Sequence, residues 1–258
     1  MREGRIPTKI TLVSTQDGRG GASIAAYRLY LGLRQLKQDT HMIVKDKSSN
    51  DPNIHEISFK THQDEMEKRI FDYIHKAEIV RDQTELTNTL FSIPYPGYNI
   101  SNNGIIRQSE IINLHWVKDF QNIETAANLL SLGKPVVWTL HDENPYTGGC
   151  HYTAGCEEYR KECRNCKQLK ENRFHIPYHT LKNKIQLWNR YKNLTIVTPS
   201  KWLGERARGS RLFKDRRVEV IPNSLETNIF KPREKESAKK ELGLDPRSTT
   251  LLVGASQL

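Results

Sequence analysis

The sequence lacks the long hydrophobic runs and the dispersed cysteines that would define whole classes of protein. No window approaches the roughly 18 consecutive apolar residues of a membrane-spanning helix, and residues 1–10 (MREGRIPTKI) hold no apolar core of a secretory signal. Only four of the 258 residues are cysteine, all between positions 150 and 166. We therefore expect a cytoplasmic protein with reduced thiols, which in that compartment are more often metal ligands than disulfides.

Two common nucleotide-binding motifs are absent as well. Residues 18–21 (GRGG) are not followed by Lys-Ser or Lys-Thr, so they are no P-loop, and they do not complete G-x-G-x-x-G. Lys45 stands where an acid would bind a ribose, which argues against a nicotinamide cofactor. Glycines before a helix still let a ligand anion approach free backbone N–H groups. The alternative is a tight turn without a ligand.

Acidic residues are scarce in one region of a chain whose net charge is +10. Residues 160–217 contain 17 Lys and Arg against four Asp and Glu, a local charge of +13. Such a block favours an anionic partner, namely phosphate, a nucleotide, nucleic acid or acidic lipid. A solvated basic surface without a partner is the alternative.

Apolar, β-branched runs alternate with segments of helical periodicity, which predicts an α/β doubly wound parallel sheet of the Rossmann-like kind. The expected strands are residues 10–15, 40–44, 54–59, 111–116, 135–141, 194–200 and 218–222. The expected helices are residues 22–37, the first half of 63–91, 123–132, 178–191 and 202–213. Residues 234–242 form one further short helix candidate, and residues 249–256 read as the first strand of another domain.

Two histidines follow strand-like runs. His141-Asp142 comes after 135–140, and His115 comes after 111–114. Because open α/β sheets bind ligands outside the carboxyl ends of their strands, His141 is expected to face a cleft. A histidine that only caps the following loop is the alternative, and it is the stronger reading for His115.

The four cysteines follow the pattern C-x5-C-x6-C-x2-C, at Cys150, Cys156, Cys163 and Cys166. The last two have the spacing of a zinc knuckle, whereas the first two are further apart than is usual. A loop with so few apolar residues would gain from a structural zinc. Four reduced thiols without a metal are the alternative.

Several stretches together resemble one protein family. They are GRGGASIAAYRLYLGL, IINLHWV, KPVVWTLHDENPYTGGCHY, CRNCKQL, TPSKWL and VEVIPNSLETNIFKP. They are similar to the N-terminal half of family 4 glycosyltransferases, of the colanic-acid and capsular-polysaccharide type. The resemblance implies a GT-B fold, a nucleotide-sugar donor, and a retaining transfer without a catalytic metal.

The resemblance also implies roles for individual residues. Gly20 and Gly21 are expected near the donor diphosphate, and His141 near the donor sugar. We assign Asp142, Trp116 and Lys201 to the acceptor side. Residues 1–225 are the expected acceptor-side domain with a cysteine-rich insert at 142–176. Residues 226–248 are the expected linker, and 249–258 the first strand of a nucleotide-sugar domain.

The sequence departs from the family pattern in two places. Ser224 stands where the family usually has glycine, and the nucleotide-sugar domain is not in the sequence beyond that first strand. We therefore expect residues 1–258 alone to be inactive. The implied function is transfer of a sugar to a saccharide or lipid-linked acceptor in surface polysaccharide biosynthesis.

Two further partner hypotheses concern the basic block. Residues 178–192 place Leu181, Ile185 and Trp188 on one helical face among Lys182, Lys184, Arg190 and Lys192. That pattern is typical of a helix bound to an anionic membrane, here the inner face, and equally of a helix packed on a sheet. The competing functional class is a basic, zinc-stapled nucleic-acid-binding module that stacks bases on Trp188, Tyr191 and Trp202.

Overall fold

The computed structural model describes residues 6–57, 62–87 and 89–253. Its centre is a seven-stranded sheet of order β3-β2-β1-β4-β5-β6-β7, in which all neighbouring strands are parallel. The predicted doubly wound parallel sheet is therefore confirmed. The strands are β1 (Lys9–Gln16), β2 (Asp39–Asp46), β3 (Ile54–Glu56), β4 (Ile111–Leu114), β5 (Val136–Thr139), β6 (Leu194–Thr198) and β7 (Val218–Val220).

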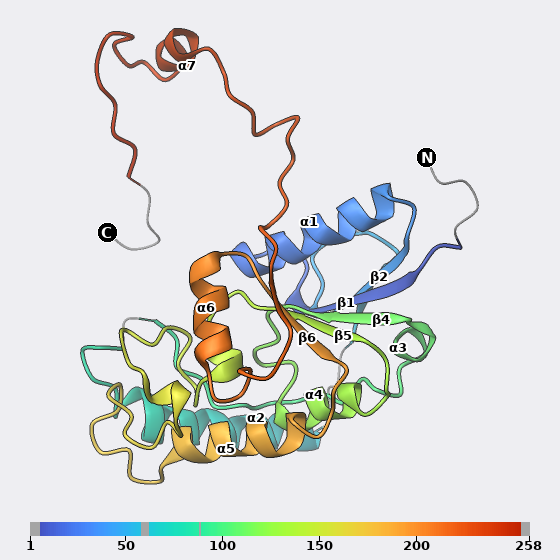
Figure 1. Cartoon of the computed structure of the whole chain (residues 1–258), viewed down its shortest axis with the longest axis vertical. Coiled ribbons are helices and arrows are strands. Elements are labelled where there is room, and N and C mark those ends of the chain that lie inside the picture. Colours follow the sequence, from blue (N-terminus) through green and yellow to red (C-terminus); the bar gives the residue numbers. More distant parts are fainter. Residues whose placement is uncertain (1–5, 58–61, 88, 254–258) are drawn as a thin grey trace. The chain divides into compact units, whose positions relative to one another are not determined.

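Helices cover both faces of the sheet. Figure 1 shows α1 (Gly21–Gln35) on one face and α4 (Ile123–Leu130) with α5 (Ile176–Trp188) on the other. The strand order reverses between β1 and β4. Such a reversal requires that the connections before and after it cross on opposite faces of the sheet. The other helices of this part are α2 (His62–His75), α3 (Gly104–Gln108) and α6 (Lys201–Gly209), and α6 packs on β6 and β7.

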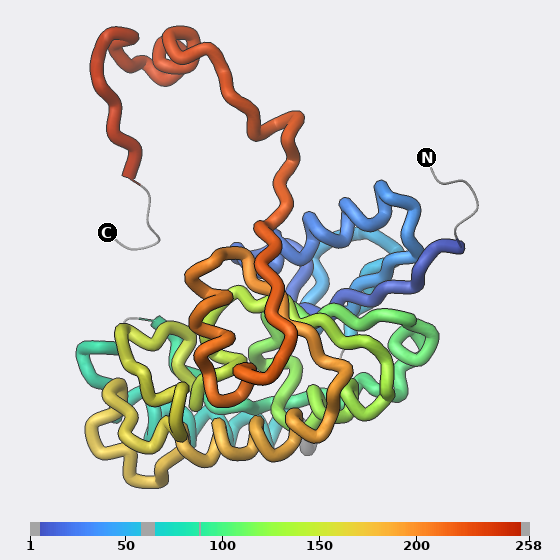
Figure 2. The backbone as a smooth tube through the Cα atoms, in the orientation of Figure 1, coloured from blue at the N-terminus to red at the C-terminus, as the bar shows by residue number. Residues whose placement is uncertain are grey.

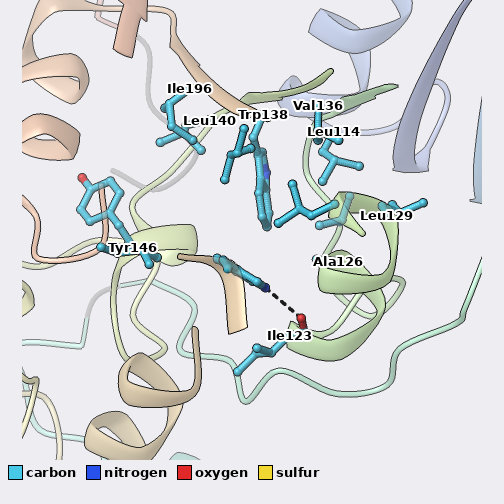
Figure 3. Packing of buried hydrophobic residues seen from close by; sticks show 14 of the residues in the cluster. Leu114, Ile123, Ala126, Leu129, Val136, Trp138, Leu140, Tyr146 and Ile196 are labelled. Atoms are coloured by element: carbon cyan, nitrogen blue, oxygen red, sulfur yellow. Dashed lines mark hydrogen bonds between the residues drawn. The ribbon is translucent and has the colours of Figure 1, made fainter. Parts of the chain in front are cut away.

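The largest core cluster lies between the sheet and the α4–α5 layer. Figure 3 shows Leu114, Trp138 and Ile196 from the strands facing Ile123 and Leu129 of α4. Trp188 of α5 enters the same cluster and donates its indole N–H to the carbonyl of Ile123 at 2.8 Å. The strands read as near-continuous apolar runs because both faces of a parallel sheet are covered.

The element boundaries differ from the prediction at a few places. Strand β3 ends at Glu56, and residues 58 and 59 of the predicted strand lie outside the described residues. Helix α2 continues into a π-helical segment, Lys76–Val80, before the chain enters a loop. Helix α3 was not predicted: its five residues are too few to show a helical period, and its N-terminus is set by Asn103, whose side chain accepts from Ile105 N.

The insert after β5 is held by a segment far away in the sequence. Figure 2 shows residues 80–87 and 89–92 running beside the chain of the insert. The carboxylate of Asp82 accepts hydrogen bonds from the backbone N–H groups of Glu171 and Asn172, both at 2.9 Å. Isolated bridges also pair Gln83 with Leu169 and Phe91 with Cys150. The insert is thus packed against the domain and does not project from it.

Contacts divide the chain into two compact units, Met1–Ser224 and Leu225–Leu258. The second unit contains helix α7 (Lys235–Glu241), which corresponds to the predicted helix at 234–242. Residues 249–253 form no strand; their described side chains at Leu251 and Leu252 are about nine-tenths exposed, and a strand needs a hydrogen-bonding neighbour. Residues 254–256 of that predicted strand lie outside the described residues, and their assignment to a further domain stays a prediction.

Candidate functional site

The carboxyl ends of β1, β4 and β5 lie next to one another, because β4 pairs in parallel with both β1 and β5. The strand order reverses between β1 and β4, and open α/β sheets bind ligands at such a point. Strand β1 leads into the glycine loop, β4 into His115 and Trp116, and β5 into His141 and Asp142. The motifs singled out from the sequence therefore meet at one edge of the sheet.

A cleft opens at this edge, beside β4 and β5; its empty space of about 590 Å³ includes space open to solvent. Trp116, His141 and Asp142 line it, so three of the predicted site residues come together. Residues 92–95, 117–119 and 121–123 form further parts of the wall. His151 of the insert and Lys184 of α5 also line the cleft, and the sequence had not assigned either of them to a site.

His115 and His141 form a hydrogen-bonded pair in the wall of the cleft. His115 Nδ1 lies 3.0 Å from His141 Nε2, and the two rings stack with centroids 5.3 Å apart. Burial, reinforced by the neighbouring His141, holds the pKa of His115 well below 6.5. Burial likewise lowers the pKa of His141 to about 4, although Asp142 acts against it. Both rings are therefore neutral at pH 7, and one donates to the other.

The hydrogen-bond partners of His115 indicate which ring is the donor. Its Nε2 is buried and has no partner among the described residues. A buried N–H without an acceptor is rarer and costlier than a buried acceptor without a donor. The favoured tautomer therefore carries the His115 proton on Nδ1, which donates to His141 Nε2. His141 then keeps its own proton on Nδ1, so an uncharged donor remains for an oxygen of a ligand.

Asp142 is the centre of a second network. Its Oδ2 accepts from Trp116 Nε1 at 2.9 Å and from His151 Nδ1 at 2.6 Å, and its Oδ1 accepts from the backbone N–H of Asn144 at 3.0 Å. The other nitrogen of His151 lies 2.8 Å from the hydroxyl of Ser92. The carboxylate thus fixes the orientation of both Trp116 and His151 in the cleft wall.

Glu143, the next residue, joins the strand tip to the insert and to α6. Its side chain is 1% exposed; it pairs with Arg206 at 2.5 Å and accepts from Tyr146 Oη and from the backbone N–H of Thr153. Burial raises the pKa of Tyr146, and the neighbouring carboxylate raises it further. The two adjacent acids therefore make different contacts: Asp142 binds groups of the cleft wall, and Glu143 links the strand end to the insert and to α6.

Lys184 is buried, although the sequence pattern grouped it with Lys182, Arg190 and Lys192 as a surface charge of the 178–192 helix. It is 3% exposed, and its ammonium donates to the carbonyls of Asn144 and Thr147 at 2.7 and 3.0 Å. These carbonyls belong to the first residue of the short 3₁₀ turn after β5 and to its C-cap. Burial lowers the pKa of Lys184 to about 8. The lysine fixes the turn that carries Asp142 and Glu143.

The glycine loop lies at the amino end of α1, outside the lining of the cleft. Gly20 has φ 82°, a conformation that favours glycine, and no described atom lies within 4 Å of a Cβ built on Gly20 or Gly21. The loop shape is set by Asp17, which accepts from Ser48 N and Ser49 N. Burial disfavours the ionised carboxylate, but these hydrogen bonds outweigh it and lower the pKa of Asp17 to about 2. The surface beside both glycines is open to a ligand.

Lys201 is the first residue of α6 and is exposed. It does not line the cleft that contains Trp116 and Asp142. The helix begins there because the side chain of Ser200 accepts a hydrogen bond from Leu203 N at 3.2 Å. The structure therefore places Lys201 apart from the other two residues that we assigned to the acceptor side.

The four cysteines line one small cavity on the far side of the 142–150 turn. All four are free thiols. Within the described ranges, no group of three or more His, Cys, Asp or Glu side chains converges closely enough to hold a metal ion. Burial raises the pKa of Cys150, and it raises the pKa of Cys163 to about 12 and of Cys166 to about 11. Zinc binding stays a prediction, because the side chains as placed do not form a tetrahedral set.

The helix of the basic block packs inward. Leu181 and Trp188 are buried against the core cluster, and Ile185 packs on it. Trp188 is therefore not free to stack a base, in contrast to Trp202, which is 49% exposed. In the part of the chain that the structure describes, no helix combines the length and the apolar character needed to span a bilayer.

Comparison with known proteins finds similarity in fold among solved structures. No family model matches the chain, and no curated protein matches it. A crystal structure of Anabaena Alr3699/HepE in complex with UDP is similar to it at 12% identity, with a TM-score of 0.46. The match covers 92% of this chain and 50% of that one, so this chain spans about half the length of the structure it matches. UDP is the ligand of that protein, and no ligand of this chain is inferred from it.

Proposed function

We propose that this chain is the acceptor-side domain of a GT-B glycosyltransferase that transfers a sugar from a nucleotide-sugar donor. The acceptor is a saccharide or a lipid-linked saccharide of surface polysaccharide biosynthesis. The observation that carries the proposal is the cleft at the reversal of strand order, where neutral His141 and the carboxylate of Asp142 lie side by side. The motif resemblance described above supports the same assignment.

The chemistry of glycosyl transfer suits these residues. When the bond between the sugar and the diphosphate breaks, negative charge builds on the leaving phosphate and positive charge on the sugar ring. The open amino end of α1 at Gly20 and Gly21 would stabilise the phosphate through backbone N–H groups. His141, held neutral by burial, would donate its Nδ1–H to a sugar oxygen without adding positive charge beside the ring.

Asp142 and Trp116 would hold the acceptor. The carboxylate already accepts three hydrogen bonds, so its position is fixed before a ligand arrives. The indole ring of Trp116 presents an apolar face to the cleft while its N–H is bound to Asp142. Fixing two sugars in such a cleft removes a large entropic part of the barrier. By the resemblance, the transfer proceeds with retention and without a catalytic metal.

The proposal is tested by adding the downstream nucleotide-sugar domain to this chain and screening nucleotide sugars for release of a nucleoside diphosphate. Release that depends on an acceptor, with a new glycosidic bond seen by NMR, is the expected result. The anomeric coupling constant of the product then reports retention or inversion. An oligonucleotide bound in a salt-dependent way, with no turnover of any nucleotide sugar, would contradict the proposal and favour the nucleic-acid module.

A further inference from the structure

A second cavity adjoins the cleft; its empty space of about 510 Å³ also includes space open to solvent. The two share part of their walls, because Ser92, Ile93, Tyr95, Lys118 and Asp119 line both. The remainder of the second cavity is formed by the carboxyl end of β2, by helix α2 and by Pro96. A ligand with more than one ring can therefore extend from the cleft into this second space, which we call the lysine cavity.

The lysine cavity carries one positive charge that is not neutralised by a neighbour. Lys68 pairs with Asp72 and Lys118 pairs with Asp119, each at 2.5 Å. Lys45 lies at the end of β2, is partly buried, and has no hydrogen-bond or ion-pair partner among the described residues. An anion that reaches Lys45 therefore gains an ionic partner, whereas the other two lysines of the cavity already have one.

The same cavity has an aromatic wall. Phe71 of α2 and Tyr95 of the following loop both line it, and their rings stack with centroids 3.5 Å apart. The face of an aromatic ring carries partial negative charge and attracts the positively polarised C–H groups of a sugar ring. Aromatic faces together with a single free ammonium match a saccharide that carries one negative charge.

We propose that the lysine cavity binds an acidic sugar unit of the acceptor, with its carboxylate on Lys45 and its ring against Phe71 and Tyr95. The next unit of the acceptor then passes the shared wall into the cleft at Asp142. The inference rests on the proposed function, because it names the acceptor class of the same site. One net positive charge suits a singly charged carboxylate better than a doubly charged phosphate ester.

The test is a binding titration of this 258-residue chain, followed by NMR, with three probes at equal ionic strength. The probes are a disaccharide of glucuronate and glucose, its neutral glucose–glucose counterpart, and a glucose phosphate. We expect the uronate disaccharide to bind about tenfold more tightly than the neutral one, because a hydrogen bond to a charged group is stronger than one between neutral groups. Its affinity should fall as salt rises.

Lys45→Gln should remove this tenfold preference, so that the uronate and the neutral disaccharide bind with equal affinity. The matched control is Lys192→Gln, which removes the same charge at an exposed position outside both cavities and should change the affinity less than twofold. Equal binding of the neutral and uronate probes would overturn the proposal, as would equal losses in the two variants. Tighter binding of the glucose phosphate than of the uronate would overturn the carboxylate assignment.

Failure of this inference is distinguishable from failure of the proposed function. Transfer by the longer enzyme to a uronate-bearing acceptor that Lys45→Gln does not slow would contradict the lysine cavity and leave the glycosyltransferase standing. Uronate binding that depends on Lys45, with no turnover of any nucleotide sugar, would contradict the glycosyltransferase and leave a saccharide site.

Discussion

The cleft and the cysteine cavity lie on two sides of the same turn, residues 142–150, and they are stabilised differently. On the cleft side, Asp142 accepts three hydrogen bonds and Lys184 donates two, so the polar groups are fixed by partners within the chain. On the other side, four thiols share a cavity, and burial raises the pKa of Cys150, Cys163 and Cys166, which keeps them protonated at neutral pH. The cleft is organised before a ligand binds, whereas the cysteine side contains groups that a metal would have to deprotonate and reorient.

The largest effect is expected for Asp142→Ala, which removes the centre of the cleft network. Three donors, on Trp116, His151 and Asn144, would lose their acceptor, and the free energy of unfolding should fall by about 3 kcal/mol. Urea denaturation measures it, with exposed Asp215→Ala as the control. A loss below about 1 kcal/mol would mean that the cleft is not held by this carboxylate. Cys156→Ser, on the other side of the turn, should cost much less in the same assay.

The second prediction concerns the pH dependence of stability on the cleft side. Burial lowers the pKa of His141 to about 4, whereas in the unfolded chain it titrates near 6.5. Between these values the unfolded chain binds a proton that the folded chain does not. The stabilisation is therefore complete above pH 6.5 and is lost as the pH falls towards 4. From pH 7 to pH 4.5 the loss should be about 2–3 kcal/mol.

Urea denaturation at both pH values, repeated with His141→Gln, isolates this contribution. The variant should show a flatter pH dependence, while exposed His179→Gln should behave like the original chain. Equal pH dependence of the original chain and His141→Gln would show that His141 is not held neutral by the fold.

The third prediction concerns activity of the longer enzyme. His141→Ala removes the neutral donor that we place against the donor sugar, and kcat should fall about 10²-fold, or about 2.7 kcal/mol. The fold should be retained because the side chain lies at a strand tip in the cleft wall. Steady-state kinetics with the identified donor measures the change. Unchanged kcat would remove His141 from the reacting centre.

A fourth prediction tests whether zinc binding fixes the four cysteines on the other side of the turn. We expect about one zinc per chain after purification without added metal. With free zinc at about 100 times its dissociation constant, the stability should rise by about 2.7 kcal/mol. Metal analysis and thermal unfolding with and without a chelator decide this. Four thiols that titrate freely in the folded protein, with no bound zinc, would favour the metal-free alternative.

The smallest effect is expected at the basic surface, where the apolar face of α5 is already covered. Only exposed charges such as Lys182, Arg190 and Lys192 remain for a membrane, each worth about 1 kcal/mol near an anionic surface. Co-sedimentation with vesicles should rise with anionic lipid and disappear at high salt. Arg190→Glu with Lys192→Glu should weaken it. Equal binding to neutral vesicles would contradict an electrostatic contact.

The sheet was predictable because β1, β4, β5 and β6 are apolar runs that are each followed by a helical period, and the position of His141 followed from the end of such a run. Lys184 carried a signal that was missed: it lies three residues after Leu181 and four before Trp188, which places it on the apolar face of α5. A lysine at such a position is either buried with acceptors or snorkels to water, and only the tertiary contacts distinguish the two.

Other parts of the site left no local signal. Ser92 meets His151 across 59 positions of the sequence, and Phe71 meets Tyr95 only after α2 folds back towards the loop. No pattern in the sequence around these residues indicates that they are in contact. Lys45 was noted only because it is not an acid, and its place beside a cavity depends on how β2 ends against α2.

His151 belongs to the insert and yet forms part of the cleft wall, which sets a limit on how the chain can be shortened. Gln168 donates its side-chain amide to the carbonyl of Tyr152 at 2.7 Å, so the chain enters and leaves the cysteine-bearing excursion at nearly the same place. A linker joining these two points would delete Cys156, Cys163 and Cys166 and keep His151, but it would also delete Thr153, which donates to Glu143, and the buried Tyr159. A cut made a few residues earlier would open the cleft to solvent on one side. A shortened domain therefore has to keep the chain through Thr153 and to fill the space that Tyr159 occupies.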